Sequence, residues 1–402
     1  MITSEEALNF IENNIKDFGI EEIPLEQGIN RILREDIHAD RDFPPYDRVT
    51  MDGIAISYEQ FKAGNRTFKV AGIAAAGSPK TKLDDPSQCL EVMTGAIMPE
   101  GVDTVIRYED ITLDNGIAVI DIEEIKHQQN IHFKGIDRKE GDKILHSGIR
   151  ISSSEIGVCA TVGKAKIKVS RMPKTIIIST GDELVGVDET PLPHQIRKSN
   201  VFGLETVLEH YDLQVDSAHL LDDYDSIVEK LKTYLNDYEL IILSGGVSKG
   251  KYDYLPQALE DVGVEKLFHK VKQRPGKPFW FGKYKEEATV FAFPGNPVSS
   301  FMCSQYYLKY WLNKSIQHES TFLPKVKLGA DVNFMPDLTY FLEVKISVND
   351  QAEMIAQPIK GNGSGDLANL VDADAFIVLP RGRNDYYKDE VFPIFFYREI
   401  SS

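Results

Sequence analysis

The sequence predicts a multidomain α/β protein whose core is a doubly wound parallel sheet, and three observations support this. At 402 residues, the chain exceeds a single hydrophobic core and should hold several domains of about 100–200 residues. Residues 173–312 alternate apolar strand patterns with helical patterns, which is typical of parallel strands joined by crossover helices. On either side the pattern changes to short strands punctuated by glycine and proline.

The first helix and the segments around it are predicted to form a connecting region. Thr3 and Glu6 have the spacing of a capping box. Apolar residues then recur at helical spacing, at Leu8, Ile11, Ile15 and Phe18. Residues 142–172 contain a serine-capped helix near Ser154 and a strand at 165–169 that could pair with the N-terminal segment. We therefore group 1–41 with 142–172 as a connecting region, around an inserted, mostly β lobe at 42–141.

The remaining chain divides into the core and a C-terminal domain. We assign residues 173–318 to the α/β core, with helices expected at 199–211, 225–235 and 298–312. Residues 319–402 contain alternating strands and little helix, which predicts a small β-barrel or sandwich.

The composition restricts the partners. A formal charge of −17 repels nucleic-acid backbones and anionic membranes, so we expect neither as a partner. Cys89, Cys159 and Cys303 are far apart and odd in number, which favours a reducing cytoplasm over a disulfide framework or a thiolate zinc site. No apolar run approaches the roughly 20 residues that span a bilayer, and the N-terminus lacks the apolar segment of a secretory signal. We expect a cytoplasmic location.

Three loops follow core strands, and parallel strands bring such loops to one crevice. They are S-T-G-D-E-L (179–184), S-G-G-V-S-K-G-K-Y-D (244–253) and F-P-G-N-P (293–297). The second loop resembles an anion cradle, in which glycines present N–H groups and a serine adds a hydroxyl. These candidate phosphate-binding residues are Gly245, Gly246, Ser248 and Gly250. The spacing is not that of an NTPase P-loop, and a plain turn is the alternative.

Charged residues near these loops suggest further roles. Beside an anion cradle, Asp253 would bind Mg²⁺ or a polar ligand edge, although an aspartate there is also a common helix N-cap. Asp182 and Glu183 pose the same choice between caps and site carboxylates. Arg274 and Lys277 flank a Pro-Gly turn that brings two cations together in an acidic chain, although such charges are usually solvated surface.

Together with further motifs, these stretches resemble the molybdopterin molybdenumtransferase family, of the MoeA and gephyrin E-domain type. The resemblance covers nearly the whole chain. The other motifs are P-P-Y-D-R-V-T-M-D-G-I-A (44–55), T-G-A-I-M-P-E-G-V-D-T-V-I-R-Y-E-D (94–110), S-N-V-F-G-L (199–204), P-G-K-P (275–278) and G-N-G-S-G (361–365). The resemblance implies a homodimer of four-domain subunits with a MogA-like core, in which 1–41 and 142–172 form the dimerisation region.

The resemblance also implies an activity and a set of site residues. The activity is insertion of molybdate into adenylylated molybdopterin, with release of AMP and dependence on Mg²⁺, and the upstream adenylyltransferase is a further expected partner. We assign catalytic roles to Asp52, Glu183 and Lys277, with Asp52 and Glu183 as candidates for either positioning or proton transfer. We assign substrate binding to Thr94, Asp137, Asn200, Arg274, Pro294, Pro297 and Ser364, beside the loop residues named above, and metal binding to Asp253 and Asp222.

Two departures from the family pattern keep alternatives open. His132 stands where the family usually has an arginine, and Ile136 replaces an acid beside Asp137, although Lys134 or Arg138 could compensate. Glu343 stands where a molybdate-facing arginine is expected. The alternatives are a dimeric pterin-binding scaffold without turnover, and a competence-damage-type nucleotide hydrolase. The hydrolase does not account for the M-D-G, T-G-A and P-G-N-P motifs.

Overall fold

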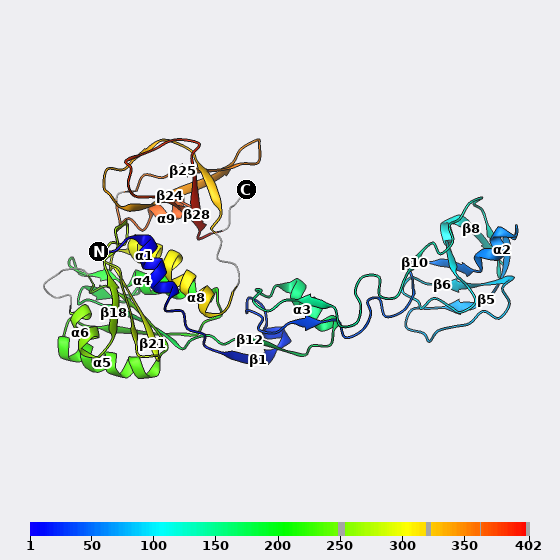
Figure 1. Ribbon diagram of the computed structural model, residues 1–402, viewed down its shortest axis with the longest axis horizontal. Coiled ribbons are helices and arrows are strands. Elements are labelled where there is room, and N and C mark those ends of the chain that lie inside the picture. Colours follow the sequence, from blue (N-terminus) through cyan, green and yellow to red (C-terminus); the bar gives the residue numbers. More distant parts are fainter. Residues whose placement is uncertain (248–253, 319–322, 362, 399–402) are drawn as a thin grey trace. The chain divides into compact units, whose positions relative to one another are not determined.

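The computed structural model describes residues 1–247, 254–318, 323–361 and 363–398 (Figure 1). Its contacts divide the chain into two compact units. The first unit contains Met1–Arg34, Ser147–Ser152 and Lys166–Ser402, and the second contains Glu35–His146 and Ser153–Ala165. None of the described helices is long and apolar enough to cross a membrane.

A six-stranded sheet forms the core of the first unit. Its strand order is β16-β13-β17-β21-β20-β18. The strands are β16 (Val215–Leu220), β13 (Thr175–Thr180), β17 (Leu240–Ser244), β21 (Ala288–Phe293), β20 (Trp280–Tyr284) and β18 (Glu265–His269). The first four run parallel, which confirms the predicted α/β class, and β20 alone runs antiparallel to both of its neighbours, so the sheet is mixed at this edge. The link from β20 to β21 is a three-residue turn, too short for a parallel crossover.

Helices cover both faces of this sheet because its strands are apolar on both sides. Ile177 and Ile242 point into one cluster and their neighbours Ile178 and Leu243 into the other, following the two-residue period of a strand. The first face packs against α1 (Ser4–Glu12), α4 (Ser199–Glu209), α7 (Pro297–Cys303), a π-helical segment η3 (Ser304–Leu308) and α8 (Lys309–Ser315). The second packs against α5 (Tyr224–Asp237) and α6 (Leu255–Asp261).

Helix α1 begins as predicted and ends early. The Thr3 side chain accepts from the Glu6 N–H, and the Glu6 carboxylate accepts from the Thr3 N–H, so the capping box is confirmed. The helix stops at Glu12, because two asparagines follow and asparagine competes with helical backbone bonds. The expected helical positions of Ile15 and Phe18 are therefore wrong, although Phe18 is buried in the same cluster.

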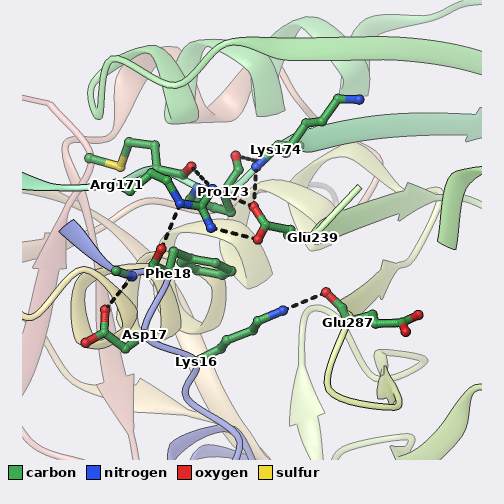
Figure 2. A network of polar contacts seen from close by, with 11 residues as sticks. Lys16, Asp17, Phe18, Arg171, Pro173, Lys174, Glu239 and Glu287 are labelled. Atoms are coloured by element: carbon green, nitrogen blue, oxygen red, sulfur yellow. Dashed lines mark hydrogen bonds and ion pairs between the residues drawn. The ribbon is translucent and has the colours of Figure 1, made fainter. Parts of the chain in front are cut away.

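An antiparallel ladder joins β1 (Ile20–Pro24) to β12 (Lys166–Ser170), as expected for the N-terminal segment. Just after β12, Arg171 ties the chain to the core (Figure 2). Its guanidinium donates to the Phe18 carbonyl at 2.7 Å and to both carboxylate oxygens of Glu239 at 2.8 Å. This ion pair holds the pKa of Glu239 below its usual range.

The C-terminal strands of the first unit close into a barrel. Strands β24, β25, β22, β28 and β26 are neighbours in that order, and β26 pairs back with β24. Their bounds are β22 (Lys325–Leu328), β24 (Thr339–Val348), β25 (Met354–Pro358), β26 (Ala375–Leu379) and β28 (Val391–Phe396). Of the two forms predicted for the C-terminal domain, a small barrel or a sandwich, the structure shows the barrel. A short strand of the core domain, β19 (Gln273–Arg274), pairs with β24 in parallel at the edge of this sheet.

The second unit is mostly β. Its sheet has the order β7-β4-β6-β5-β9-β8 and is apolar on both faces. The strands are β4 (Gly53–Ile56), β5 (Thr67–Ala74), β6 (Gln88–Val92), β7 (Thr104–Arg107), β8 (Ile111–Asp114) and β9 (Ile117–Ile120). Shorter elements are β2 (Ile37–His38), β3 (Arg48–Val49), β10 (Ile131–His132), β11 (Lys143–Leu145), α2 (Tyr58–Lys62) and α3 (Ser153–Thr161).

Candidate functional site

The described parts of the three predicted loops meet at the carboxyl ends of β13, β17 and β21, where they line a cleft of about 420 Å³. This is the edge at which open α/β sheets bind ligands. The cleft is lined by seven of the predicted site residues: Glu183, Asn200, Asp222, Gly245, Gly246, Pro294 and Pro297.

A second, larger cavity of about 880 Å³ adjoins the cleft. Arg274, Lys277 and Ser364 line it, and it shares Pro278 and Asn296 with the first cleft. The Pro-Gly turn after β19 carries the two cations, and the loop before Asp366 supplies the opposite wall. The first unit therefore offers one continuous surface with a polar, glycine-rich end and a cationic end.

Two asparagines lock the loops together. The Asn200 amide donates to Ser244 Oγ at 2.9 Å and to the Gly295 carbonyl at 2.8 Å, so it joins the ends of β17 and β21. Asn296 donates to Ser364 Oγ at 2.9 Å and joins the start of α7 to the C-terminal segment. Asn200 thus has a positioning role besides any contact with ligand. Asn296 was not predicted as a site residue, although it lies in the quoted F-P-G-N-P loop.

Arg274 and Lys277 are exposed, and within the described part of the chain neither pairs with a carboxylate. The Arg274 guanidinium lies 5.8 Å from the centre of the Phe334 ring, a cation–π distance that leaves its N–H groups available. The cavity lining carries these two cations and one carboxylate, Asp366, so its charge favours an oxyanion ligand.

The two neighbouring acids of the first loop have different surroundings. Asp182 accepts a hydrogen bond from the Asp222 N–H at 3.1 Å, which ties the first loop to the segment before α5, whereas the N-cap of α5 is Asp223. Glu183 lines the cleft, as do Ser179 and Lys198, which were not predicted as site residues.

The predicted metal site is described only in part, because Asp253 lies outside the described residues. In the described ranges, no group of three or more His, Cys, Asp or Glu side chains is arranged to hold a metal. Asp222 does line the cleft. Mg²⁺ is commonly held by one or two carboxylates together with substrate phosphates, so the cleft fits a magnesium bound in that way.

The anion cradle also remains a prediction, since Ser248 and Gly250 fall outside the described ranges. Of the described glycines, Gly245 already donates its N–H to the Phe293 carbonyl at 3.1 Å. Gly246 has a positive φ of 65° and lines the cleft.

The other predicted residues belong to the second unit, where two contacts fix them. Asp52 Oδ1 accepts from the Thr94 N–H at 2.6 Å and from Thr94 Oγ1 at 2.8 Å. These bonds lower the pKa of Asp52, which keeps its carboxylate ionised. His132 Nε2 lies 3.0 Å from both carboxylate oxygens of Asp137, so the residue that replaces the family's arginine still contacts Asp137.

Glu343, the second departure from the family pattern, is 9% exposed on β24. Burial raises the pKa of its carboxyl, against a smaller opposing effect of the Arg274 charge. Because this carboxyl ionises less readily, it neutralises less of the positive charge of Arg274. A buried glutamate at the expected arginine position therefore opposes anion binding less than an exposed glutamate would.

A histidine beside the cleft makes stability depend on pH. His219 Nδ1 lies 2.9 Å from Ser179 Oγ, and burial, with a contribution from Lys198, lowers the pKa of His219. Unfolded histidine takes up its proton near pH 6.5, before the folded one does. We expect stability to fall as the pH drops below about 6.5, levelling off below the folded pKa.

The measurement is the thermal midpoint of wild type and His219→Gln between pH 7.5 and 5.5. The variant should lose less stability over this range. His210 and His269, whose pKa values burial also lowers, remain in both proteins as an internal reference. Equal losses would show that His219 does not contribute.

Three family models match successive parts of the chain. Residues 2–163 match the MoeA N-terminal region (domain I and II), residues 176–314 a probable molybdopterin binding domain, and residues 325–395 the MoeA C-terminal region (domain IV).

Curated relatives and solved structures cover almost the whole length. A molybdopterin molybdenumtransferase from Synechocystis sp. is 37% identical over 98% of this chain and 100% of its own. One from Haemophilus influenzae is 33% identical over 93% of each chain. Two structures of molybdopterin biosynthesis MoeA proteins from Pyrococcus horikoshii cover 99% of this chain and 100% of theirs, with TM-scores of 0.82 and 0.83 at 28% and 26% identity.

Proposed function

This chain belongs to the molybdopterin molybdenumtransferase family, a family of transferases in molybdenum cofactor synthesis, and from that premise we propose that it inserts molybdate into adenylylated molybdopterin and releases AMP. The observation that carries the proposal is the continuous surface of the first unit. Its glycine-rich cleft suits a phosphate-bearing pterin, and the adjoining cationic cavity suits an oxyanion.

In this reaction, positioning and charge neutralisation do most of the work, because the reacting groups are all anionic. The loops locked by Asn200 and Asn296 hold the pterin phosphate. Lys277 and Arg274 bind molybdate and offset the charge that develops as the phosphoanhydride breaks. Magnesium, held through Asp222 and the substrate phosphates, would supply further neutralisation.

The test is release of AMP from adenylylated molybdopterin by the purified protein, with and without molybdate and with and without Mg²⁺. We expect release that requires both. AMP release that is the same with and without molybdate would instead support a nucleotide hydrolase. Tight binding of the pterin without release would support the scaffold, the alternative favoured by Glu343 at the expected arginine position.

Three further proposals rest on the family rather than on geometry. We propose that the protein is a homodimer, that it works in the cytoplasm and that it receives its substrate from the upstream adenylyltransferase. The three cysteines are buried and free, which is compatible with a reducing compartment. Light scattering during size-exclusion chromatography tests the dimer directly.

A further inference from the structure

A buried polar network lies directly behind the turn that carries Lys277. Gln273 is 1% exposed and Tyr307 is fully buried, in a cluster that is otherwise apolar. Tyr307 donates its hydroxyl to Gln273 Oε1, and Gln273 Nε2 donates to the Gly276 carbonyl at 3.0 Å. Ser299, 2% exposed, accepts from the Gly276 N–H at 3.2 Å.

Both peptide groups of Gly276 are therefore held by buried side chains from other elements. Only glycine fits this position, because its φ is +85° and an added Cβ would lie 2.7 Å from Cys303 Sγ and 2.8 Å from Gln273 Nε2. One residue later, the Lys277 carbonyl accepts from the Val271 N–H at 2.9 Å and closes the turn.

The Lys277 side chain is exposed and forms no ion pair with a described carboxylate, so the hydrogen bonds of its backbone turn are what hold it beside the cavity. Buried polar groups are costly unless every one is bonded, and an apolar core of the same shape would be at least as stable. Here the bonds converge on the peptide before Lys277. Tyr307 also lies in η3, and π-helical segments are frequent at functional sites.

We infer that Gln273 and Tyr307 are positioning residues for Lys277, and that they set the affinity of the cavity for molybdate. The inference rests on the proposed function, because it takes Lys277 to contact the oxyanion. Without the network the turn can shift, and a displacement of about 1 Å is enough to weaken a charge-assisted contact severely.

The test compares Tyr307→Phe, Gln273→Met and the double variant. Tyr307→Phe leaves Gln273 Oε1 without its donor, and Gln273→Met leaves both the Tyr307 hydroxyl and the Gly276 carbonyl without their partner, so each should lower the melting temperature. The double variant removes the hydroxyl together with the amide and leaves only the Gly276 carbonyl unpaired, so it should be more stable than Gln273→Met alone. All three should raise the KM for molybdate by about tenfold, with kcat changed much less. Each variant loses either the hydrogen bond to the Gly276 carbonyl or the Tyr307 bond that orients the Gln273 amide.

Tyr306→Phe is the matched control. It removes a hydroxyl from the adjacent tyrosine, whose ring packs on Phe341, Phe395 and, edge-on, Tyr307. The ring contact with Tyr307 stays and the hydrogen bonds of the network are untouched, so the KM should be unchanged. If the KM follows the melting temperature and returns to the wild-type value in the double variant, the network is only structural and the inference is wrong.

Equilibrium dialysis with molybdate alone separates this inference from the proposed function. Wild type that binds molybdate without releasing AMP would contradict the proposed function, yet the variants should still bind molybdate more weakly. Equal molybdate binding by wild type and variants would overturn the positioning role even if turnover is observed. Wild type that neither binds nor uses molybdate would contradict both.

Discussion

Lys277→Met is expected to raise the molybdate concentration for half-maximal rate by roughly a hundredfold, while binding of adenylylated molybdopterin changes little. Methionine keeps most of the length of the stem and removes the charge, so packing is nearly unchanged. The lysine is exposed beside the cationic cavity, and removing it should barely alter the melting temperature.

Two comparisons make this result specific. Lys232→Met removes the same charge from the exposed surface of α5, in the same domain, and should leave the molybdate dependence unchanged. Arg274 lines the same cavity. If Lys277→Met also leaves the molybdate dependence unchanged, Lys277 is a surface charge, and Arg274→Met becomes the variant that should show the effect.

The sequence predicted the meeting of distant loops because this requires only the direction of the strands. Once 175–180, 240–244 and 288–293 are recognised as neighbouring parallel strands, the loops after them must share one edge. The reversed direction of β20 was not predicted, because apolar runs show the period of a strand but not its direction.

Side-chain contacts within the site could not be predicted in the same way. Asp182 and Glu183 are adjacent in the chain, and only the backbone of their turn decides that Asp182 bonds the Asp222 N–H while Glu183 lines the cleft. The bond between Gln273 and Tyr307 joins residues 34 apart through the packing of η3 against the turn. No spacing rule covers such a contact, because it depends on tertiary packing.

The role of Asp52 shows how local geometry narrows a choice that the sequence leaves open. Asp52 was a candidate for either proton transfer or positioning. Its hydrogen bonds from Thr94 lower its pKa, so the carboxylate holds no proton near neutral pH and is a weak base. The geometry therefore favours a role as a fixed negative charge. Gly53 beside it is required, since an added Cβ would lie 1.9 Å from the Ile106 carbonyl oxygen.

Asp52→Asn should accordingly lower the rate of AMP release by about a hundredfold, by the same factor at every pH from 6 to 9. The asparagine oxygen can still accept from Thr94, and both residues are exposed, so the fold should persist. Because the pKa is depressed, the charged form is lost only as the pH falls below the usual aspartate range, and no limb of the pH profile near neutrality belongs to Asp52.

Asp121→Asn is the matched control, since Asp121 is also exposed in the second unit and accepts from the Thr112 hydroxyl at 2.9 Å. A variant whose rate loss varies strongly between pH 6 and 9 would show that Asp52 transfers a proton, and a rate equal to that of Asp121→Asn would remove it from the site.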